Sequence, residues 1–215
     1  MPELDFEVAG AEVERYAAAP LIRLRLRVIN AEPAVHVRNV LLQCQIRIEA
    51  ARRFYQPTEQ SRLRELFGAP QDWSRTLRGL LWTHVNVTVP AFEKECLVDL
   101  PVPCSYDFNL AIAKYFYGLE TGEIPLLLLF SGTVLRQDAA GSLQLTQIPW
   151  SKEAQFRLPV QLWQEMMAHY YPDGAWLRVP RELFERIYGY KRERGFLTFE
   201  QALESLLDDR AEPVG

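Results

Sequence analysis

The sequence predicts an α+β protein that is mainly β: an antiparallel β-sandwich-like body with a C-terminal extension of two to three helices. Apolar and polar residues alternate through most of residues 1–158, which is the period of a half-buried strand. From Pro159 onward apolar residues recur at spacings of three and four, which is the period of a helix. No linker separates the two parts, so we expect residues 159–207 to pack on the body and residues 208–215 to fray.

The most apolar stretch of the chain runs from Ile124 to Leu135. It is too short to cross a bilayer as a helix, which needs about 20 residues. A continuous apolar run of this length is typical of a strand buried on both faces, and Pro125 is tolerated at the start of such a strand. We therefore expect residues 124–135 to form the central strand of the body.

Residues 22–28 and 40–48 are expected to form a pair of strands. Arg23, Arg25 and Arg27 alternate with apolar residues in the first stretch, and a similar alternation fills the second. Two half-buried strands joined by a short polar loop are most economically an antiparallel pair. The arginine row would then face away from the core.

The remainder of the body contains one helical insert and further strands. Apolar residues follow Pro57 at helical spacing, so an insert is expected near residues 57–81. Residues 82–89 and 95–102 alternate as strands do. Residues 107–119 fit both a strand and a helix; we favour a long hairpin, because only four residues connect this segment to the apolar strand.

The C-terminal extension has recognisable helix boundaries. Pro180 occupies a typical first position of a helix, and Gly195 is placed to end it. Thr198 and Gln201 have the spacing of a capping box that would begin another helix.

The charge, the start of the sequence and the cysteine count limit the kinds of partner and compartment that we expect. The chain has 215 residues and a formal net charge of -4, which gives no support to nucleic acid or to an anionic membrane as a partner. The acidic start of the chain does not resemble a signal peptide, so we expect a cytoplasmic protein with no membrane insertion. Three cysteines cannot all pair, and reduced thiols are the simplest interpretation.

No arrangement of residues predicts catalysis or a bound cofactor. Cys96, Cys104 and His84 are the weak candidates for metal ligands, but they lack the spacing of a known metal motif. Ser131 lacks the flanking glycine of a nucleophile elbow, and a Ser131–His84 pair with Asp107 nearby would require contacts that the sequence cannot establish. Glycines do not form a phosphate-binding loop.

Two sets of residues are candidates for binding a partner protein. The arginine row Arg23, Arg25 and Arg27 could meet an acidic partner or an anionic ligand, although a solvated outer sheet face is the favoured interpretation. The aromatic and methionine residues of the first C-terminal helix and of the stretch that follows it could bind a partner helix or could instead pack the extension onto the body. These candidates are Trp163, Met167, Tyr170 and Trp176.

Several stretches resemble an uncharacterised bacterial domain family whose genes often neighbour those of nickel–iron uptake hydrogenases, notably in actinobacteria. They include LQCQIRIE (42–49), VDLPVPCSYDF (98–108), GEIPLLLLFSGTV (122–134) and LPVQLWQEMM (158–167). The resemblance covers nearly the whole chain. That family has no established activity, so no position here inherits a role. The resemblance implies an accessory part in making, assembling or holding a hydrogenase.

The leading hypothesis is a non-enzymatic accessory, assembly or chaperone-like protein of a nickel–iron hydrogenase system. It would act by contact with a hydrogenase subunit or a maturation factor. One alternative is a protein that handles nickel or iron through cysteine and histidine ligands. Another is a small-ligand-binding sandwich or an unrecognised hydrolase.

Overall fold

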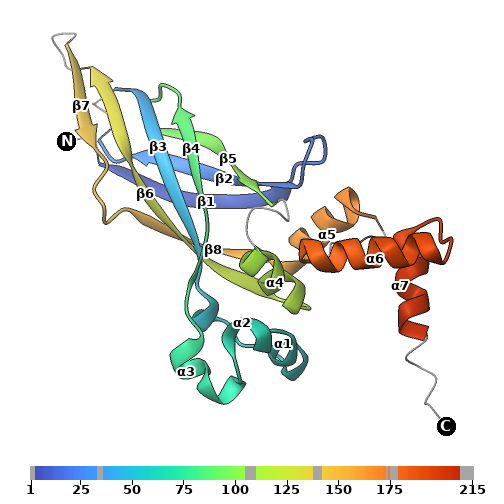
Figure 1. Ribbon diagram of the computed structural model, residues 1–215. Coiled ribbons are helices and arrows are strands. Elements are labelled where there is room, and N and C mark those ends of the chain that lie inside the picture. Colours follow the sequence, from blue (N-terminus) through green and yellow to red (C-terminus); the bar gives the residue numbers. More distant parts are fainter. Residues whose placement is uncertain are drawn as a thin grey trace. The chain divides into compact units, whose positions relative to one another are not determined.

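The computed structural model describes residues 3–32, 36–104, 110–137, 142–172, 174 and 179–208. The chain divides into two compact units, Met1–Asp173 and Gly174–Gly215. Among the described residues, the first unit contains strands β1 to β8 and the helices up to α5, and the second contains α6 and α7 (Figure 1). The expected α+β class, mainly β with C-terminal helices, is confirmed. The tail beyond residue 208 lies outside the described residues.

Sheet A is a three-stranded antiparallel sheet in the order β1-β2-β5. Its strands are β1 (Leu4–Val13), β2 (Leu21–Asn30) and β5 (Glu95–Pro103). The alternation in β2 decides which side chains face inward: Ile22, Leu24, Leu26 and Val28 are fully buried. The arginines between them lie on the outer face, as the period of a strand requires.

Sheet B is larger and has the order β4-β3-β6-β7, with β8 also paired to β6. Its strands are β3 (Val37–Ile48), β4 (Leu80–Val89), β6 (Glu123–Gln137), β7 (Leu143–Gln147) and β8 (Glu153–Pro159). The prediction of a central strand is correct, because β6 pairs with β3 on one side and with β7 and β8 on the other. Its expected burial on both faces is wrong in part: Leu127 and Leu129 are only half-buried and Ser131 is exposed.

The predicted pairing of residues 22–28 with residues 40–48 is wrong. β2 belongs to sheet A and β3 to sheet B, so the chain crosses from one layer to the other between them. Residues 33–35 of this crossing lie outside the described residues. Alternation tells which residues of a strand face the core, but a sandwich satisfies the same alternation with the two strands in opposite layers.

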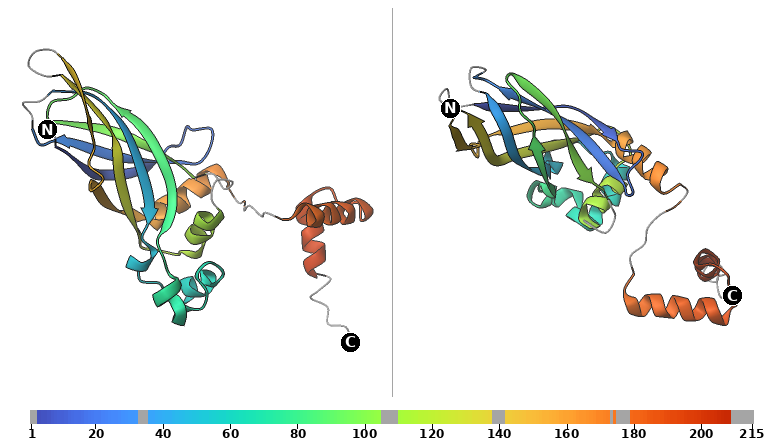
Figure 2. Two further views of the ribbon diagram at one scale, coloured as in Figure 1. Left: turned by 60° about the vertical axis from the view of Figure 1, so that its left-hand side comes forward. Right: turned by 90° about the horizontal axis from the view of Figure 1, so that it is seen from above.

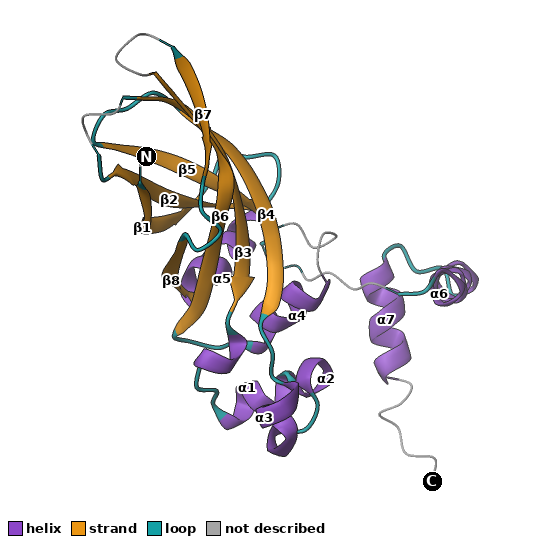
Figure 3. Ribbon diagram, turned by 90° about the vertical axis from the view of Figure 1, so that its left-hand side faces the viewer, coloured by secondary structure: helices purple, strands orange, loops and turns teal. Residues whose placement is uncertain are grey.

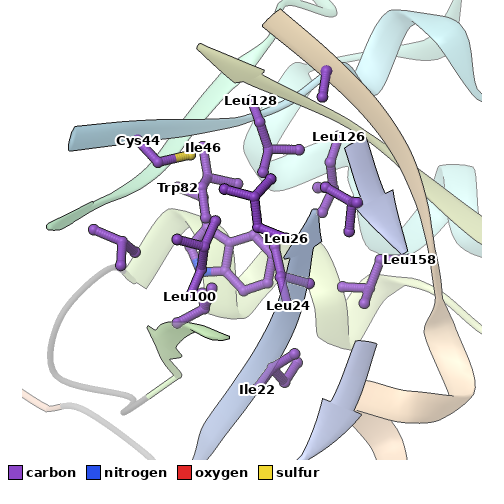
Figure 4. Packing of buried hydrophobic residues seen from close by; sticks show 14 of the residues in the cluster. Ile22, Leu24, Leu26, Cys44, Ile46, Trp82, Leu100, Leu126, Leu128 and Leu158 are labelled. Carbon is purple, nitrogen blue, oxygen red and sulfur yellow. The ribbon is translucent and has the colours of Figure 1, made fainter. Parts of the chain in front are cut away.

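The inner faces of the two sheets meet in one hydrophobic core. Phe6 of β1 and Phe130 of β6 stack across it with ring centroids 4.2 Å apart. Figure 4 shows Leu24, Leu26 and Leu100 of sheet A facing Ile46 and the leucines of sheet B. This packing gives the sandwich a rigid body on which surface groups are positioned.

Short helices fill the chain between β3 and β4. They are η1 (Ala50–Arg52), α1 (Pro57–Arg62), α2 (Arg64–Phe67), η2 (Pro70–Asp72) and α3 (Trp73–Thr76). They lie at the same end of the sheets as α4 and α5 (Figures 1 and 3). Phe67 and Leu63 are buried and connect the insert to the core.

The segment for which a hairpin was favoured is a helix, α4 (Leu110–Gly118). Its buried residues Ile112, Ala113, Tyr115 and Phe116 follow the spacing of one helix face. Lys114, which the period-2 pattern would place with them, is only half-buried. Burial of this stripe against the end of the sandwich therefore favours the helical period. Residues 107–109 lie outside the described residues.

Three helices follow β8: α5 (Val160–Tyr170), α6 (Arg181–Glu193) and α7 (Phe199–Asp208). α5 belongs to the first unit and buries Val160, Trp163, Met166 and Met167. The capping box predicted before α7 is present: Gln201 N–H donates to Thr198 Oγ1 at 3.3 Å, and Thr198 N–H donates to Gln201 Oε1 at 3.4 Å. Among the described helices, none is long and apolar enough to span a membrane.

Candidate functional site

The three arginines of β2 stand in a ladder of ion pairs on the outer face of sheet A. Arg23 lies 3.0 Å from Glu12, Arg25 lies 3.2 Å from the same carboxylate, and Arg27 lies 3.4 Å from Glu7. The carboxylates within 4.0 Å of the row belong to Glu7, Glu12, Glu14, Glu95 and Asp99. Five carboxylates against three guanidinium groups leave the ladder acidic, so its charge does not suit an acidic partner or an anionic ligand.

The candidate residues of α5 serve the interior of the first unit. Trp163 is 6% exposed and stacks on Phe116 with ring centroids 5.1 Å apart, and Met167 is 8% exposed. The Tyr170 hydroxyl donates to the backbone oxygens of Glu14 and Ala17 in the loop between β1 and β2. These side chains hold α5 and that loop in place. Trp176 lies outside the described residues.

The structure does not bring the metal-ligand candidates together. Cys96 and Cys104 lie at opposite ends of β5, and eight residues of extended strand span about 26 Å. His84 is on β4, in the other sheet. Burial raises the pKa of Cys104 to about 12 and also raises the pKa of Cys96, which disfavours the thiolate that binds metal. Within the described ranges, no three His, Cys, Asp or Glu residues are placed to hold an ion.

His84 and Ser131 lie on the same outer face of sheet B but on strands separated by β3. Gln45 stands opposite His84, and Gln43 stands opposite Ser131. Two strand spacings amount to about 10 Å, so the imidazole cannot accept the proton of the hydroxyl. The Ser131 hydroxyl instead lies 3.4 Å from Gln43 Oε1. Asp107 lies outside the described residues.

Two hollows in the first unit offer space without a converging set of reactive groups. The smaller, of about 240 Å³, lies between α2 and α4 and is lined in part by Lys114, Glu65 and Tyr117. Lys114 is already paired with Glu65, and Arg62 in the same wall lies 3.1 Å from Glu120. The larger, of about 450 Å³, lies where β6 and β8 meet the end of β3. Of the two cations that line it, Arg52 lies 2.8 Å from Glu49 and Arg157 lies 3.9 Å from Glu123.

Sequence reasoning missed the most deeply buried charges of the first unit, Arg53 and Glu59. Glu59 Oε1 accepts from Arg53 Nη2 at 2.7 Å and from the backbone N–H of Glu120 at 2.9 Å. Next to them, the hydroxyl oxygens of Tyr55 and Tyr115 lie 2.9 Å apart, and burial raises the pKa of Tyr115 to about 12. Glu59 lies three residues after Gln56 in a capping box, but the sequence pattern of such a box begins with Ser or Thr, so glutamine at this position gave no signal. The cluster fastens the helical insert to the turn before β6.

Six large apolar side chains are exposed among the described residues of the second unit. Among its described residues only Ala202 is buried. Phe184 is 43% exposed and Tyr188 is 42% exposed, and both rings approach Phe199, at 5.5 Å and 6.2 Å. Further exposed apolar residues are Leu183, Leu197, Leu206 and Leu207. The two helices meet at a steep angle (Figure 2), so they enclose little volume between them. The sequence shows these leucines and aromatic residues, but it does not show that their side chains are exposed.

Comparisons with known proteins add little beyond the family. No curated protein matches the sequence. The sporulation control protein Spo0M of Bacillus subtilis is similar at 8% identity and a TM-score of 0.32, covering 74% of this chain and 49% of Spo0M. The chain thus spans about half the length of Spo0M. A putative late embryogenesis abundant protein is similar at 13% identity and a TM-score of 0.30, covering 74% of this chain and 73% of that one.

Likenesses at these TM-scores carry no argument about function. A family model does match, over residues 1–214, and the family is described as one of unknown function. The chain therefore belongs to the DUF6084 family.

Proposed function

We propose that this chain is a non-enzymatic, cytoplasmic accessory protein that acts by protein–protein contact, with the α6–α7 pair as the contact surface. The exposed apolar surface of the second unit is the observation that carries the proposal. The partner class, a subunit or maturation factor of a nickel–iron hydrogenase, comes from the resemblance of the sequence to a family encoded beside such enzymes.

The α6–α7 pair is too small to bury its own apolar residues. Two helices of 13 and 10 residues enclose almost no core, and isolated helices of this length are marginal in water. The packed rings of Phe184, Tyr188 and Phe199 form one continuous apolar strip that is still open to solvent. Aromatic and leucine clusters of this kind are the usual anchors of protein interfaces.

A capture experiment with paired variants tests the proposal. The apolar variant Phe184→Ser with Leu206→Ser is compared with the control Glu185→Ser with Glu204→Ser, which changes exposed charged residues of the same two helices. From extracts of the native host, wild type and control are expected to recover a hydrogenase subunit or maturation protein, and the apolar variant at least tenfold less. Failure of wild type to recover any such protein, or equal recovery by the apolar variant, contradicts the proposal.

A thermal measurement on the same variants separates a partner surface from an internal one. If the strip serves a partner, the main unfolding transition of the full-length apolar variant keeps the Tm of wild type. If the strip is instead covered by the chain's own first unit, the apolar variant lowers that Tm by several degrees while the control does not.

A further inference from the structure

The outer face of sheet B differs in charge from the outer face of sheet A. Over its end nearest β7 it carries amide, hydroxyl and leucine side chains, a set that we term the neutral face. These residues are Asn39, Leu41, Gln43, Asn86, Thr88, Ser131, Thr133, Leu135, Gln137, Leu143, Leu145 and Gln147. None of them is ionisable, whereas the corresponding face of sheet A holds three arginines and their carboxylates. Arg38, at the border of the neutral face, donates to Gln137 Oε1 at 3.0 Å.

Three leucines of the neutral face are exposed. Leu41 is 62% exposed, Leu143 is 64% exposed and Leu145 is 69% exposed. Leu145 stands directly opposite Leu135, and Leu143 stands opposite Gln137, so these side chains share one face. The exposed leucines thus lie on β3 and on the edge strand β7 of the same sheet face.

The edge strand β7 has one open side. Ile148 N–H donates to the Gly132 oxygen at 2.9 Å, which makes these two residues a hydrogen-bonded pair of the antiparallel ladder. Because such pairs alternate, Thr146 and Gln144 also bond toward β6. The backbone N–H and C=O groups of Leu143, Leu145 and Gln147 therefore point away from β6. No strand among those that the structure describes pairs with that side of β7.

Apart from its short length of five residues, the open edge lacks the features that normally prevent pairing with another chain. Exposed edges are usually interrupted by lysine, proline, a bulge or an inward charge. The sequence of β7, LQLTQ, contains neither charge nor proline, and its register with β6 is unbroken. It has the composition of a strand that accepts another strand.

We propose that the outward edge of β7 binds an extended, uncharged segment of a partner protein as an additional strand of sheet B. The backbone of the segment bonds to Leu143, Leu145 and Gln147, and apolar residues at its alternate positions lie on the exposed leucines. This is strand addition, in which main-chain bonds supply affinity and alternate side chains supply specificity. The inference goes beyond the proposed function, because it rests on the first unit alone and does not involve α6 or α7.

The chemistry of the edge favours this occupant over two others. A charged segment would lose hydration against the neutral face without gaining a counter-charge. A second copy of the chain, paired through β7 alone, would share an edge of only five residues. That edge falls well short of the roughly 1,600 Å² that a stable protein interface buries, whereas recognition of a peptide needs no more than such an edge.

Capped fluorescent peptides test the inference on the full-length protein. Acetyl-TLTLTLT-amide is expected to bind at least tenfold more tightly, by fluorescence anisotropy, than the charged counterparts acetyl-KLKLKLK-amide and acetyl-ELELELE-amide. Leu145→Pro removes an outward N–H without removing a bond to β6, since proline is tolerated where the N–H of an edge strand faces solvent. We expect this variant to keep its Tm and to bind the neutral peptide at least tenfold less tightly.

Amide hydrogen exchange on the wild-type protein gives a second readout that does not depend on a variant. The neutral peptide should slow exchange at Leu145 and Gln147 at least tenfold and leave Thr146, already bonded to β6, unchanged. Equal affinity for neutral and charged peptides, full binding by Leu145→Pro, or protection confined to other strands overturns the inference. A doubled mass in sedimentation that Leu145→Pro abolishes also overturns it, because the edge then takes a second copy.

Discussion

The guanidinium group of Arg53 lies 2.7 Å from the carboxylate of Glu59, and their side chains are only 7% and 1% exposed. Arg53 also donates to the backbone oxygen of Glu123 at 2.8 Å, and Glu59 accepts from the backbone N–H of Gln56 at 3.0 Å. The pair thus joins the start of the helical insert to the first residue of β6. The pair therefore positions these elements relative to each other, and it does not line either of the two hollows described above.

The first prediction is that Glu59→Gln lowers the free energy of unfolding by about 3–5 kcal/mol. Removal of one partner leaves the buried guanidinium without a counter-charge, which is the costly way to break such a pair. Chemical denaturation measures the change. Glu65→Gln is the control: Glu65 pairs with Lys114, but its side chain is 73% exposed, so the change should stay within about 1 kcal/mol. Equal losses of stability in the two variants would contradict the role of Arg53 and Glu59 as a buried ion pair that stabilises the fold.

The second prediction concerns alkaline pH. Burial raises the pKa of Tyr115 to about 12, whereas an unfolded tyrosine has a pKa of about 10. Between these values the unfolded chain releases a proton that the folded chain retains. The contribution of Tyr115 is therefore complete below pH 10 and is lost as the pH rises toward 12. The free energy of unfolding should fall by about 2–3 kcal/mol over this range. This fall adds to the loss of stability that the other titrating groups cause at high pH.

Tyr115→Phe isolates this contribution, because phenylalanine does not titrate. The difference in unfolding free energy between wild type and the variant should be constant below pH 10 and should shrink above it. A difference that stays constant up to pH 12 would show that Tyr115 has an ordinary pKa.

The sequence predicted the fold well where one local pattern decides the outcome. Alternation identified the inward residues of β2, and the spacing of Thr198 and Gln201 identified the start of α7. It failed where the outcome depends on distant parts of the chain. Which sheet β2 joins depends on β1 and β5, and whether α4 is a helix depends on the surface that buries its stripe.

The candidate surfaces were harder to predict than the fold for the same reason. The arginine row was visible in the sequence, but the carboxylates that outnumber it come from residues 7–14, in and just after β1, and from residues 95–99 of β5. Trp163 has the same apolar character whether it is buried or exposed, and only its contact with Phe116 assigns it to the core. The open side of β7 follows from strand order, which local patterns do not contain.

The third prediction compares two tryptophans. Trp163 is 6% exposed and Trp150 is 91% exposed. Trp163→Ala should lower the free energy of unfolding by about 3–5 kcal/mol, because it leaves a cavity beside Phe116. Trp150→Ala should change it by no more than about 0.5 kcal/mol, as is usual for exposed positions. Denaturation of both variants measures the difference, and similar values for the two would argue against the burial of α5.

The fourth prediction is that Arg25→Glu destabilises the protein through sheet A and does so less at high salt. Arg25 lies 3.2 Å from Glu12 and 3.8 Å from Asp99, so a glutamate there faces two carboxylates across the neighbouring strands. The side chain is 50% exposed, which limits the expected loss to about 1–2 kcal/mol at low salt. In 1 M salt the Debye length falls to about 3 Å, and most of the loss should disappear.

Arg181→Glu provides the control for this charge reversal, because Arg181 is 92% exposed and lies 3.8 Å from Glu185 on the same helix. Its effect on the free energy of unfolding should stay within about 0.5 kcal/mol at any salt concentration.

The Arg25→Glu variant also tests whether the arginine row takes part in partner capture. Arg25→Glu can reduce capture of the partner protein simply because less of the variant is folded. If high salt then restores both the folded fraction and the capture, the arginine row acts through the stability of sheet A. If the variant is fully folded and still captures less partner, the row is a contact surface. That outcome would contradict the inference that the acidic ladder does not suit an acidic partner.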